Sequence, residues 1–286
     1  MTRIFGAAAA GLLAVVVIPL GGSPPAHAEQ ASDWHVDAHT GTRMRLVAGG
    51  TGAGAGHPGK LMAGIEIELP DGWKTYWRHP GDAGVPPEFT WPGGANVAAA
   101  TVLYPAPHRY PDPAGSIIGY KNRVTLPVLI ERADPSAPAV LTLDAAIGVC
   151  ADICVPIQAQ FSAGADADGP VPASVSAALR RVPGPGTDPS AVPRVVGHTA
   201  TFDGKSPNIG FEVDFGPAAA SGDIFIEGPR GLYIPMAERL GDPAGSRVRF
   251  RIDLTQTDDA ADLKGKAVRV TMVSDAGQAE AELVLP

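Results

Sequence analysis

The sequence contains little sulfur and less positive than negative charge. Cys150 and Cys154 are its two cysteines among 286 residues. The 22 lysines and arginines are outnumbered by 30 aspartates and glutamates, which gives a formal net charge of -8. A protein with this charge is repelled by nucleic acid and by anionic lipid surfaces. We therefore expect no nucleic-acid partner and no binding to an anionic membrane.

Apolar segments long enough to cross a membrane are also missing. The apolar stretch Ala7–Leu20 has 14 residues, whereas spanning a bilayer requires about 20. Arg3 precedes this stretch, and Ala26-His27-Ala28 follows it with the small-residue pattern of a signal-peptide cleavage site. We expect residues 1–28 to be a cleavable signal peptide and the mature chain to lie in the periplasm, without a membrane span.

Helical periodicity is almost absent from the rest of the sequence. Short runs of alternating apolar and polar residues are separated by turn-forming residues, and glycine (35) and proline (29) are abundant. This pattern is typical of strands joined by turns. It predicts an all-β protein with two tandem immunoglobulin-like β-sandwich domains after the signal peptide. The candidate strands are 42–48, 61–69, 88–91, 97–104, 123–130, 139–147 and 155–161, then 198–202, 208–215, 224–227, 247–254, 267–274 and 278–285.

Changes in composition predict the domain boundaries. Residues 29–162 form the first predicted sandwich, which contains both cysteines. Residues 163–195 are rich in Ala, Gly, Pro and Asp, which indicates a linker, with one short helix expected at 173–181. Residues 196–286 form the second predicted sandwich, which has no cysteine.

The cysteine pair is the clearest chemical device in the sequence. Cys150 and Cys154 are separated by three residues and lie between two strand-like runs. An exported protein meets oxidising conditions, so the pair is expected to form a disulfide across a tight loop. An inert structural bridge is one interpretation, but closing so short a loop contributes only about 2 kcal/mol. A small exposed ring is better suited to attack by an incoming thiol.

Charges near the sulfurs in the sequence are negative. Asp152 lies between the cysteines and Asp144 lies six residues upstream of Cys150. Negative neighbours disfavour a thiolate and favour a reducing role for the pair. The same two thiols could instead hold Cu(I), which prefers soft ligands, whereas zinc would need further ligands that the scattered histidines do not supply at familiar spacing. No organic cofactor is expected.

An aromatic segment at residues 70–84 precedes the cysteines. Trp73, Tyr76 and Trp77 lie close together, followed by a Pro80–Gly84 segment that indicates a turn. One interpretation is that these rings fill a sandwich core. The other is that some of them lie beside the sulfurs and shield them. Both can hold.

Three blocks of sequence together resemble a known family. They are Asp71–Arg78 with Pro80-Gly81-Asp82, then Gly119-Tyr120 with Val124–Val128, and then Cys150–Pro156. In this order, over residues 42 to 162, they resemble the N-terminal periplasmic domain of the thiol:disulfide interchange protein DsbD, particularly the variant of copper-tolerance relatives such as ScsB. The resemblance implies an immunoglobulin-like sandwich with the cysteines on a hairpin.

The resemblance also implies roles for individual residues. Cys154 would attack the disulfide of a client protein, and Cys150 would resolve the mixed disulfide. A cap is expected near residues 108–115 with Tyr110 as its lid residue, and Tyr120 and Asp152 are further candidates for substrate contact. Family members have more widely spaced cysteines.

The family also implies partners. Full-length members continue into a membrane domain and a thioredoxin-like domain, so this chain would depend on a separate membrane electron donor and would exchange electrons with periplasmic thiol proteins. The alternatives are a copper-tolerance accessory that binds Cu(I) through Cys150 and Cys154, and a β-sandwich interaction protein with an inert disulfide.

Overall fold

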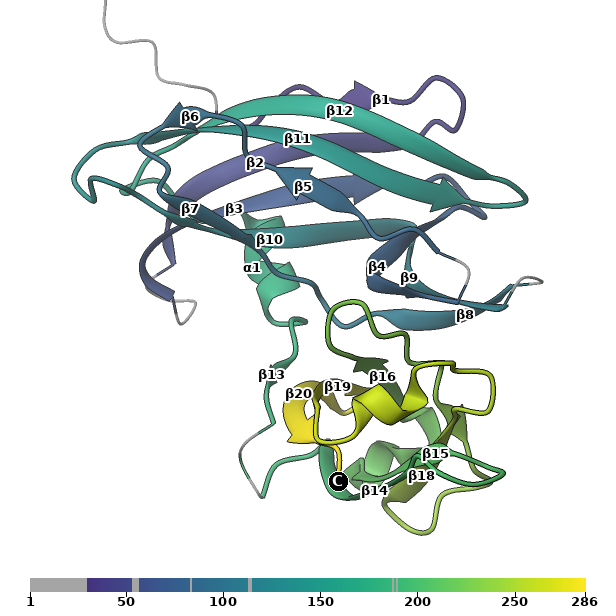
Figure 1. The fold of residues 1–286 in the computed structure, drawn as a ribbon. Coiled ribbons are helices and arrows are strands. Elements are labelled where there is room, and N and C mark those ends of the chain that lie inside the picture. The colour runs from purple at the N-terminus through teal and green to yellow at the C-terminus, as the bar shows by residue number, and fades with distance from the viewer. Residues whose placement is uncertain (1–29, 53–56, 83, 113–114, 187, 189) are drawn as a thin grey trace, which may run out of the picture.

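The computed structural model describes residues 30–286 except 53–56, 83, 113–114, 187 and 189. The expected signal peptide at residues 1–28 lies outside this range. Most of the described chain is β-sheet, as the sequence predicted (Figure 1). No helix in the described part of the chain is long and apolar enough to cross a membrane.

The N-terminal part of the chain folds into two sheets that enclose a common core. One has the strand order β1-β2-β3-β10-β7, and the other has the order β12-β11-β4-β9-β8, with β5 and β6 also paired to β11. Leu46 and Ile65 from the first sheet and Trp77 and Leu141 from the second are fully buried in this core. The strands are β1 (His35–Val36), β2 (Arg43–Gly52), β3 (His57–Glu68), β4 (Lys74–Gly81), β5 (Glu88–Thr90), β6 (Gly94–Ala95), β7 (Ala99–Val102), β8 (His108–Asp112), β9 (Gly115–Lys121), β10 (Arg123–Glu131), β11 (Ala139–Cys150) and β12 (Cys154–Ala165).

The C-terminal part forms a second, smaller pair of sheets. Their strand orders are β13-β20-β19-β16 and β14-β15-β18-β17. Phe215 and Phe250 pack edge to face in a core of their own, with ring centroids 6.2 Å apart. The elements are β13 (Gly184–Pro185), β14 (Arg194–Thr201), β15 (Asn208–Asp214), η2 (Gly216–Ser221), β16 (Asp223–Glu227), β17 (Glu238–Arg239), β18 (Arg247–Asp253), η3 (Ala260–Leu263), β19 (Ala267–Ser274) and β20 (Gly277–Val284).

The segment predicted to be a linker contains a helix that packs against the N-terminal sheets. α1 (Ala173–Leu179) is close to the expected range of 173–181. Val175 is fully buried and packs with Val47, Met62 and Leu129. Gly64 permits this approach, because a Cβ at that position would lie 2.6 Å from Val175 Cγ2. Part of the segment is therefore fixed to the first pair of sheets.

Five strands of the N-terminal part were not predicted as strands, namely the two-residue strands β1 and β6 and the longer strands β4, β8 and β9. β4 covers part of the aromatic segment, and the β8–β9 hairpin lies where a cap was expected. β4 lacks clean alternation because Tyr76 and Trp77 are both buried, one on each face. The immunoglobulin-like classification of each sheet pair and the exact domain boundaries stay predictions.

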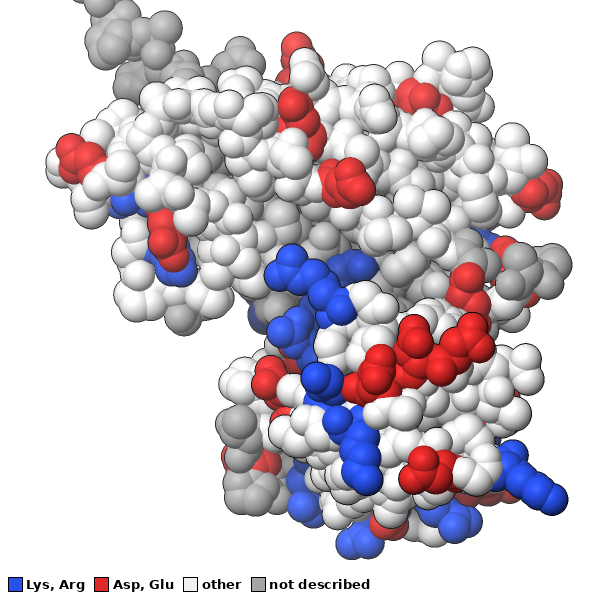
Figure 2. Space-filling model, viewed as in Figure 1, with Lys and Arg blue, Asp and Glu red and all other residues white. Residues whose placement is uncertain are grey.

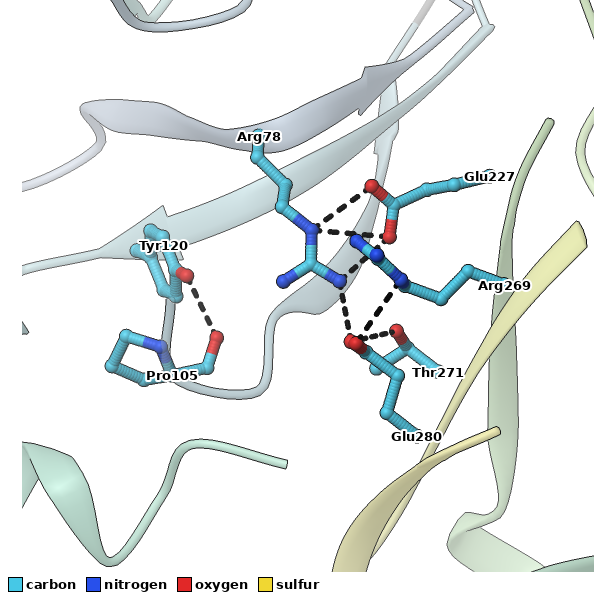
Figure 3. Close-up of polar contacts among 7 residues, drawn as sticks. All are labelled: Arg78, Pro105, Tyr120, Glu227, Arg269, Thr271 and Glu280. Carbon is cyan, nitrogen blue, oxygen red and sulfur yellow. Dashed lines mark hydrogen bonds and ion pairs between the residues drawn. The ribbon is translucent and has the colours of Figure 1, made fainter. Parts of the chain in front are cut away.

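The two pairs of sheets meet at a polar and aromatic junction on β4 and β8. Arg78 Nε and Nη2 donate to the two carboxylate oxygens of Glu227, and Nη2 also contacts Glu280 (Figure 3). Arg109 donates to both oxygens of Asp223, at 2.9 Å each. In Figure 2, basic and acidic side chains gather where the two parts meet. Bidentate pairs of this kind fix orientation as well as adding energy.

Candidate functional site

Cys150 and Cys154 lie at the tip of the long β11–β12 hairpin. The two residues are directly opposite each other in the antiparallel register, and their Cα atoms are 4.2 Å apart. Their sulfurs form a disulfide. A backbone hydrogen bond from Ala151 N to Ile153 O closes the three-residue loop. The hairpin geometry therefore brings the two sulfurs together.

The two cysteines differ in their exposure. Cys150 is 5% exposed, and β4 shields it on the side opposite β12, where Lys74 is its partner in the register. Cys154 is exposed, as is Asp152 at the tip of the loop. Ile153 between them is 67% exposed, which is unusual for a large apolar side chain. An incoming protein can reach Cys154, whereas Cys150 is covered.

Tyr76 is the side chain that contacts the exposed cysteine. Its hydroxyl lies 3.2 Å from Cys154 Sγ, while its ring is buried. Two glycines make room for the ring, because a Cβ at either Gly84 or Gly148 would come within 2.8 Å of it. The aromatic segment thus serves both purposes considered above, since Trp77 fills the core and Tyr76 lies beside the sulfur.

The protonation state of Tyr76 follows from its surroundings. Burial of the ring raises the pKa of Tyr76 above its ordinary value of 10, and the negative charge of Asp112 raises it further. The phenol is therefore protonated near neutral pH and can donate its hydrogen to sulfur. A thiolate at Cys154 would accept that hydrogen bond more strongly than a disulfide does, because charged acceptors form stronger bonds.

Tyr110 on the β8–β9 hairpin lies beside the sulfur site. It packs against the cluster formed by Tyr76, Ile117 and Cys150. The ammonium group of Lys121 lies over the Tyr110 ring, 4.4 Å from its centroid. The side chain expected to act as a lid therefore lies next to the sulfur site, on a paired strand. Residues 113–114 of the expected cap lie outside the described part of the chain.

Tyr120 lies in the core and not at the surface, where a residue that contacts a substrate is expected. It is 4% exposed and belongs to the main core, and its hydroxyl donates to the carbonyl of Pro105 at 2.7 Å (Figure 3). Burial raises the pKa of Tyr120 well above 10. A ring enclosed on all sides cannot contact a client, so we correct this assignment to a structural one.

The fold places a basic residue beside the sulfurs, where the sequence showed only acidic neighbours. Lys74 lies opposite Cys150 in the register, although it is 76 residues away along the chain. Its ammonium group lies 3.9 Å from a carboxylate oxygen of Asp112. The acidic residues that neighbour the sulfurs in the sequence are therefore joined in space by a basic group on the strand next to Cys150.

A groove opens beside Cys154 on the outer face of the hairpin. Its volume is about 380 Å³, and its walls are mainly apolar. Val85 in its wall is 62% exposed. The lining residues are Tyr76, Val85, Pro86, Glu88, Ala146, Ile147, Gly148, Cys154, Val155, Pro156, Ile157 and Gln158. Exposed apolar surface next to a reachable sulfur is typical of a protein-binding site.

The two sulfurs were also considered as ligands for Cu(I). Among the described residues, no group of three or more His, Cys, Asp or Glu side chains is placed to hold a metal ion. The Cu(I) alternative at Cys150 and Cys154 would thus be a two-thiolate site formed after reduction of the disulfide.

Comparison with known proteins supports the resemblance predicted from the three sequence blocks. Residues 53–165 match the family model described as thiol:disulfide interchange protein DsbD, N-terminal. The chain is also similar to the crystal structure of the N-terminal periplasmic domain of ScsB from Proteus mirabilis. That match has a TM-score of 0.69 and 20% identity, and it covers 90% of this chain and 98% of the other. Coverage of this extent shows that the shared fold includes the C-terminal sheets.

A second solved structure gives no further information. InvD from Yersinia pseudotuberculosis aligns with a TM-score of 0.18 and 9% identity, over 79% of this chain and 53% of that chain. An overlap this poor carries no conclusion about fold or function. No curated protein matches the sequence.

Proposed function

We propose that this chain, whose residues 53–165 form a domain of the DsbD N-terminal type, is a periplasmic protein-disulfide reductase that works through Cys150 and Cys154. The observation that carries the proposal is the difference in exposure between the two cysteines. Cys154 is exposed and Cys150 is covered. A thiol-exchange protein needs one sulfur that meets the client and one that is kept for the second step.

The chemistry requires no cofactor. In the reduced protein, the Cys154 thiolate attacks one sulfur of a client disulfide, and the other client sulfur leaves as a thiolate. The Cys150 thiolate then attacks Cys154 Sγ, which restores the Cys150–Cys154 disulfide and releases the first client sulfur as a thiolate. Two electrons pass to the client. A separate membrane protein then reduces the Cys150–Cys154 disulfide again.

The residues around the sulfurs support this cycle. The Tyr76 hydroxyl, 3.2 Å from Cys154 Sγ, would stabilise the attacking thiolate by donating its hydrogen. Tyr110 and the β8–β9 hairpin act as the cap over Cys150. The apolar groove next to Cys154 receives the client segment, and the exposed Ile153 and Asp152 at the loop tip contact its rim.

Trapping tests the proposal. A Cys150→Ser form expressed in a periplasm should accumulate mixed disulfides at Cys154, because the resolving thiol is missing. The matched Cys154→Ser form should accumulate none. If neither variant captures a protein, or if both capture the same proteins equally, the proposed reductase role is wrong.

A redox titration distinguishes the reductase from an inert bridge. A reduction potential between about -160 and -300 mV suits exchange, whereas a value well below about -300 mV suits a structural disulfide. Copper that stays with the reduced protein through desalting, and is lost in Cys150→Ser, would support the Cu(I)-binding alternative.

A further inference from the structure

The C-terminal sheets contact the same strand that supplies Tyr76 to the sulfur site. β4 pairs with β9 through Lys74, Thr75 and Tyr76, and the next pair along the two strands is Gly81 with Ile117. Tyr76 is therefore the last residue of β4 in regular register before an irregular stretch. A strand that leaves its ladder needs other contacts to hold its position.

The C-terminal sheets supply those contacts immediately after Tyr76. The Trp77 ring packs against Phe225 of β16, with centroids 5.8 Å apart. The Arg78 side chain is bound on two sides by Glu227 and Glu280, and Thr271 and Arg269 contact Glu280 in turn (Figure 3). The Arg78 side chain is 21% exposed, so these ion pairs are partly shielded from water.

The segment that contains Gly84, beside the Tyr76 ring, is also tied to the C-terminal part of the chain, through the loop between β16 and β17. Gly84 lies against the ring, as described above. Two residues before it, Asp82 accepts a hydrogen bond of 2.6 Å from the hydroxyl of Tyr233. Burial and this carboxylate raise the pKa of Tyr233 to about 12, so the hydroxyl keeps its hydrogen at neutral pH. The strand that carries Tyr76 and the loop that covers it are thus both held from the same side.

We propose that the C-terminal sheets position the catalytic site: Arg78, with Glu227 and Glu280, and Tyr233, with Asp82, hold β4 and its neighbouring loop so that the Tyr76 hydroxyl stays in contact with Cys154 Sγ. This inference rests on the proposed function for its significance. It makes Arg78 and Tyr233 positioning residues, since neither contacts a sulfur. It also gives the C-terminal sheets, which contain no cysteine, a task in the reaction.

The reactivity of a single thiol tests the coupling. In the full-length Cys150→Ser protein, the rate of Cys154 alkylation by iodoacetamide is measured against pH, and its midpoint gives the apparent pKa of that thiol. Tyr76→Phe should raise this pKa, because the thiolate loses a hydrogen-bond donor. At pH 7 we expect alkylation to slow by about 3- to 10-fold, the range expected when one such bond is lost.

Arg78→Met should slow alkylation in the same direction if it lets Tyr76 move away. The decisive comparison is the double variant. With Tyr76→Phe already present, Arg78→Met should have no further effect, because the contact that it positions is gone. Arg123→Met is the matched control, since the Arg123 side chain is 73% exposed and its ion pair is with Glu68 of β3 and not with the C-terminal sheets. It should leave the pH profile unchanged.

A second variant tests the same coupling if Arg78→Met does not fold. Tyr233→Phe removes only the hydroxyl that binds Asp82, on a side chain that is 53% exposed. It should shift the alkylation profile in the same direction as Arg78→Met and by less. The inference is overturned if folded Arg78→Met and Tyr233→Phe both keep the parent profile, or if their effects add in full to that of Tyr76→Phe. Failure to trap clients would refute the proposed function and leave this result unaffected.

Discussion

The sulfur site and the junction between the sheet pairs lie on adjacent residues of β4, yet they are held by opposite kinds of interaction. Tyr76 meets Cys154 through a single hydroxyl contact and ring packing between two glycines. Arg78, two residues later, is bound by two carboxylates, and Trp77 is fully buried against Phe225. The comparison indicates that charge-assisted hydrogen bonds hold the support of the site, whereas Tyr76 is positioned by close packing and directs its hydroxyl at the reactive sulfur.

The largest expected effect is a loss of disulfide-reductase activity, and it belongs to the sulfur site. Cys154→Ala should abolish reduction of protein disulfides, because it removes the attacking sulfur. The loss of so short a ring should cost only about 2 kcal/mol of unfolding free energy. Insulin reduction and urea denaturation measure the two effects on the same sample. A variant that keeps its activity would remove Cys154 from the mechanism.

The next effect is in stability and belongs to the junction. Arg78→Met leaves Glu227 and Glu280 without their shared partner, which should cost about 2 to 3 kcal/mol, a value reduced from that of a fully buried pair because the site is partly wet. Arg123→Met, at an exposed pair, should cost less than about 0.5 kcal/mol. Equal losses in denaturant unfolding would show that the junction is no stronger than a surface ion pair.

A smaller effect is expected from crowding the sulfur site. Gly148→Ala places a methyl group 2.8 Å from Tyr76 Cε2, so the ring must shift. We expect a loss of about 1 to 2 kcal/mol, together with slower alkylation of Cys154 in the reduced protein. Gly197→Ala is the matched control on a strand, because nothing lies within 4 Å of the added Cβ. Identical behaviour of the two variants would contradict the tight fit of Tyr76.

The smallest effect concerns acid sensitivity at the junction. Burial lowers the pKa of His79 below its ordinary 6.5, against the opposing influence of Glu227 and Asp82. The unfolded chain therefore binds a proton at higher pH than the folded chain. Stability from this group is complete above pH 6.5 and is lost as the pH falls below it.

Thermal unfolding between pH 7.5 and 5.5 measures this loss. The melting temperature should fall over this interval, and it should fall less in His79→Gln. Aspartates with lowered pKa values, such as Asp214, titrate below this window and do not confuse the result. A fall that is equal in the parent and the variant would assign the acid sensitivity to other groups.

Local sequence patterns predicted many of the strands, because a strand with one buried face can be recognised from the alternation of apolar and polar residues within it. β11 shows this well, since its alternate residues are buried from Ala139 to Val149. β4 escaped prediction because Tyr76 and Trp77 face different environments and both are buried. The proximity of the two sulfurs could also be predicted, because it depends only on the short loop between Cys150 and Cys154.

Contacts between distant segments could not be predicted in this way. Arg78 is 149 residues from Glu227 and 202 from Glu280 along the chain. No sequence pattern links such positions. Tyr76 was flagged only as one of several aromatic residues, and its role depends on glycines at 84 and 148 that the fold brings to either side of it. Tyr120 was misassigned because it belongs to one of the blocks that resemble the family, and the sequence does not show that its side chain is buried.

The most direct test of the account is to identify which sulfur reacts first. The fully reduced wild-type protein is mixed briefly with oxidised glutathione and quenched with acid, and the adduct is located by peptide mass spectrometry. We expect glutathione on Cys154, followed by formation of the Cys150–Cys154 disulfide. Glutathione on Cys150 alone, or two thiols that stay unreacted while the protein is folded, would contradict it.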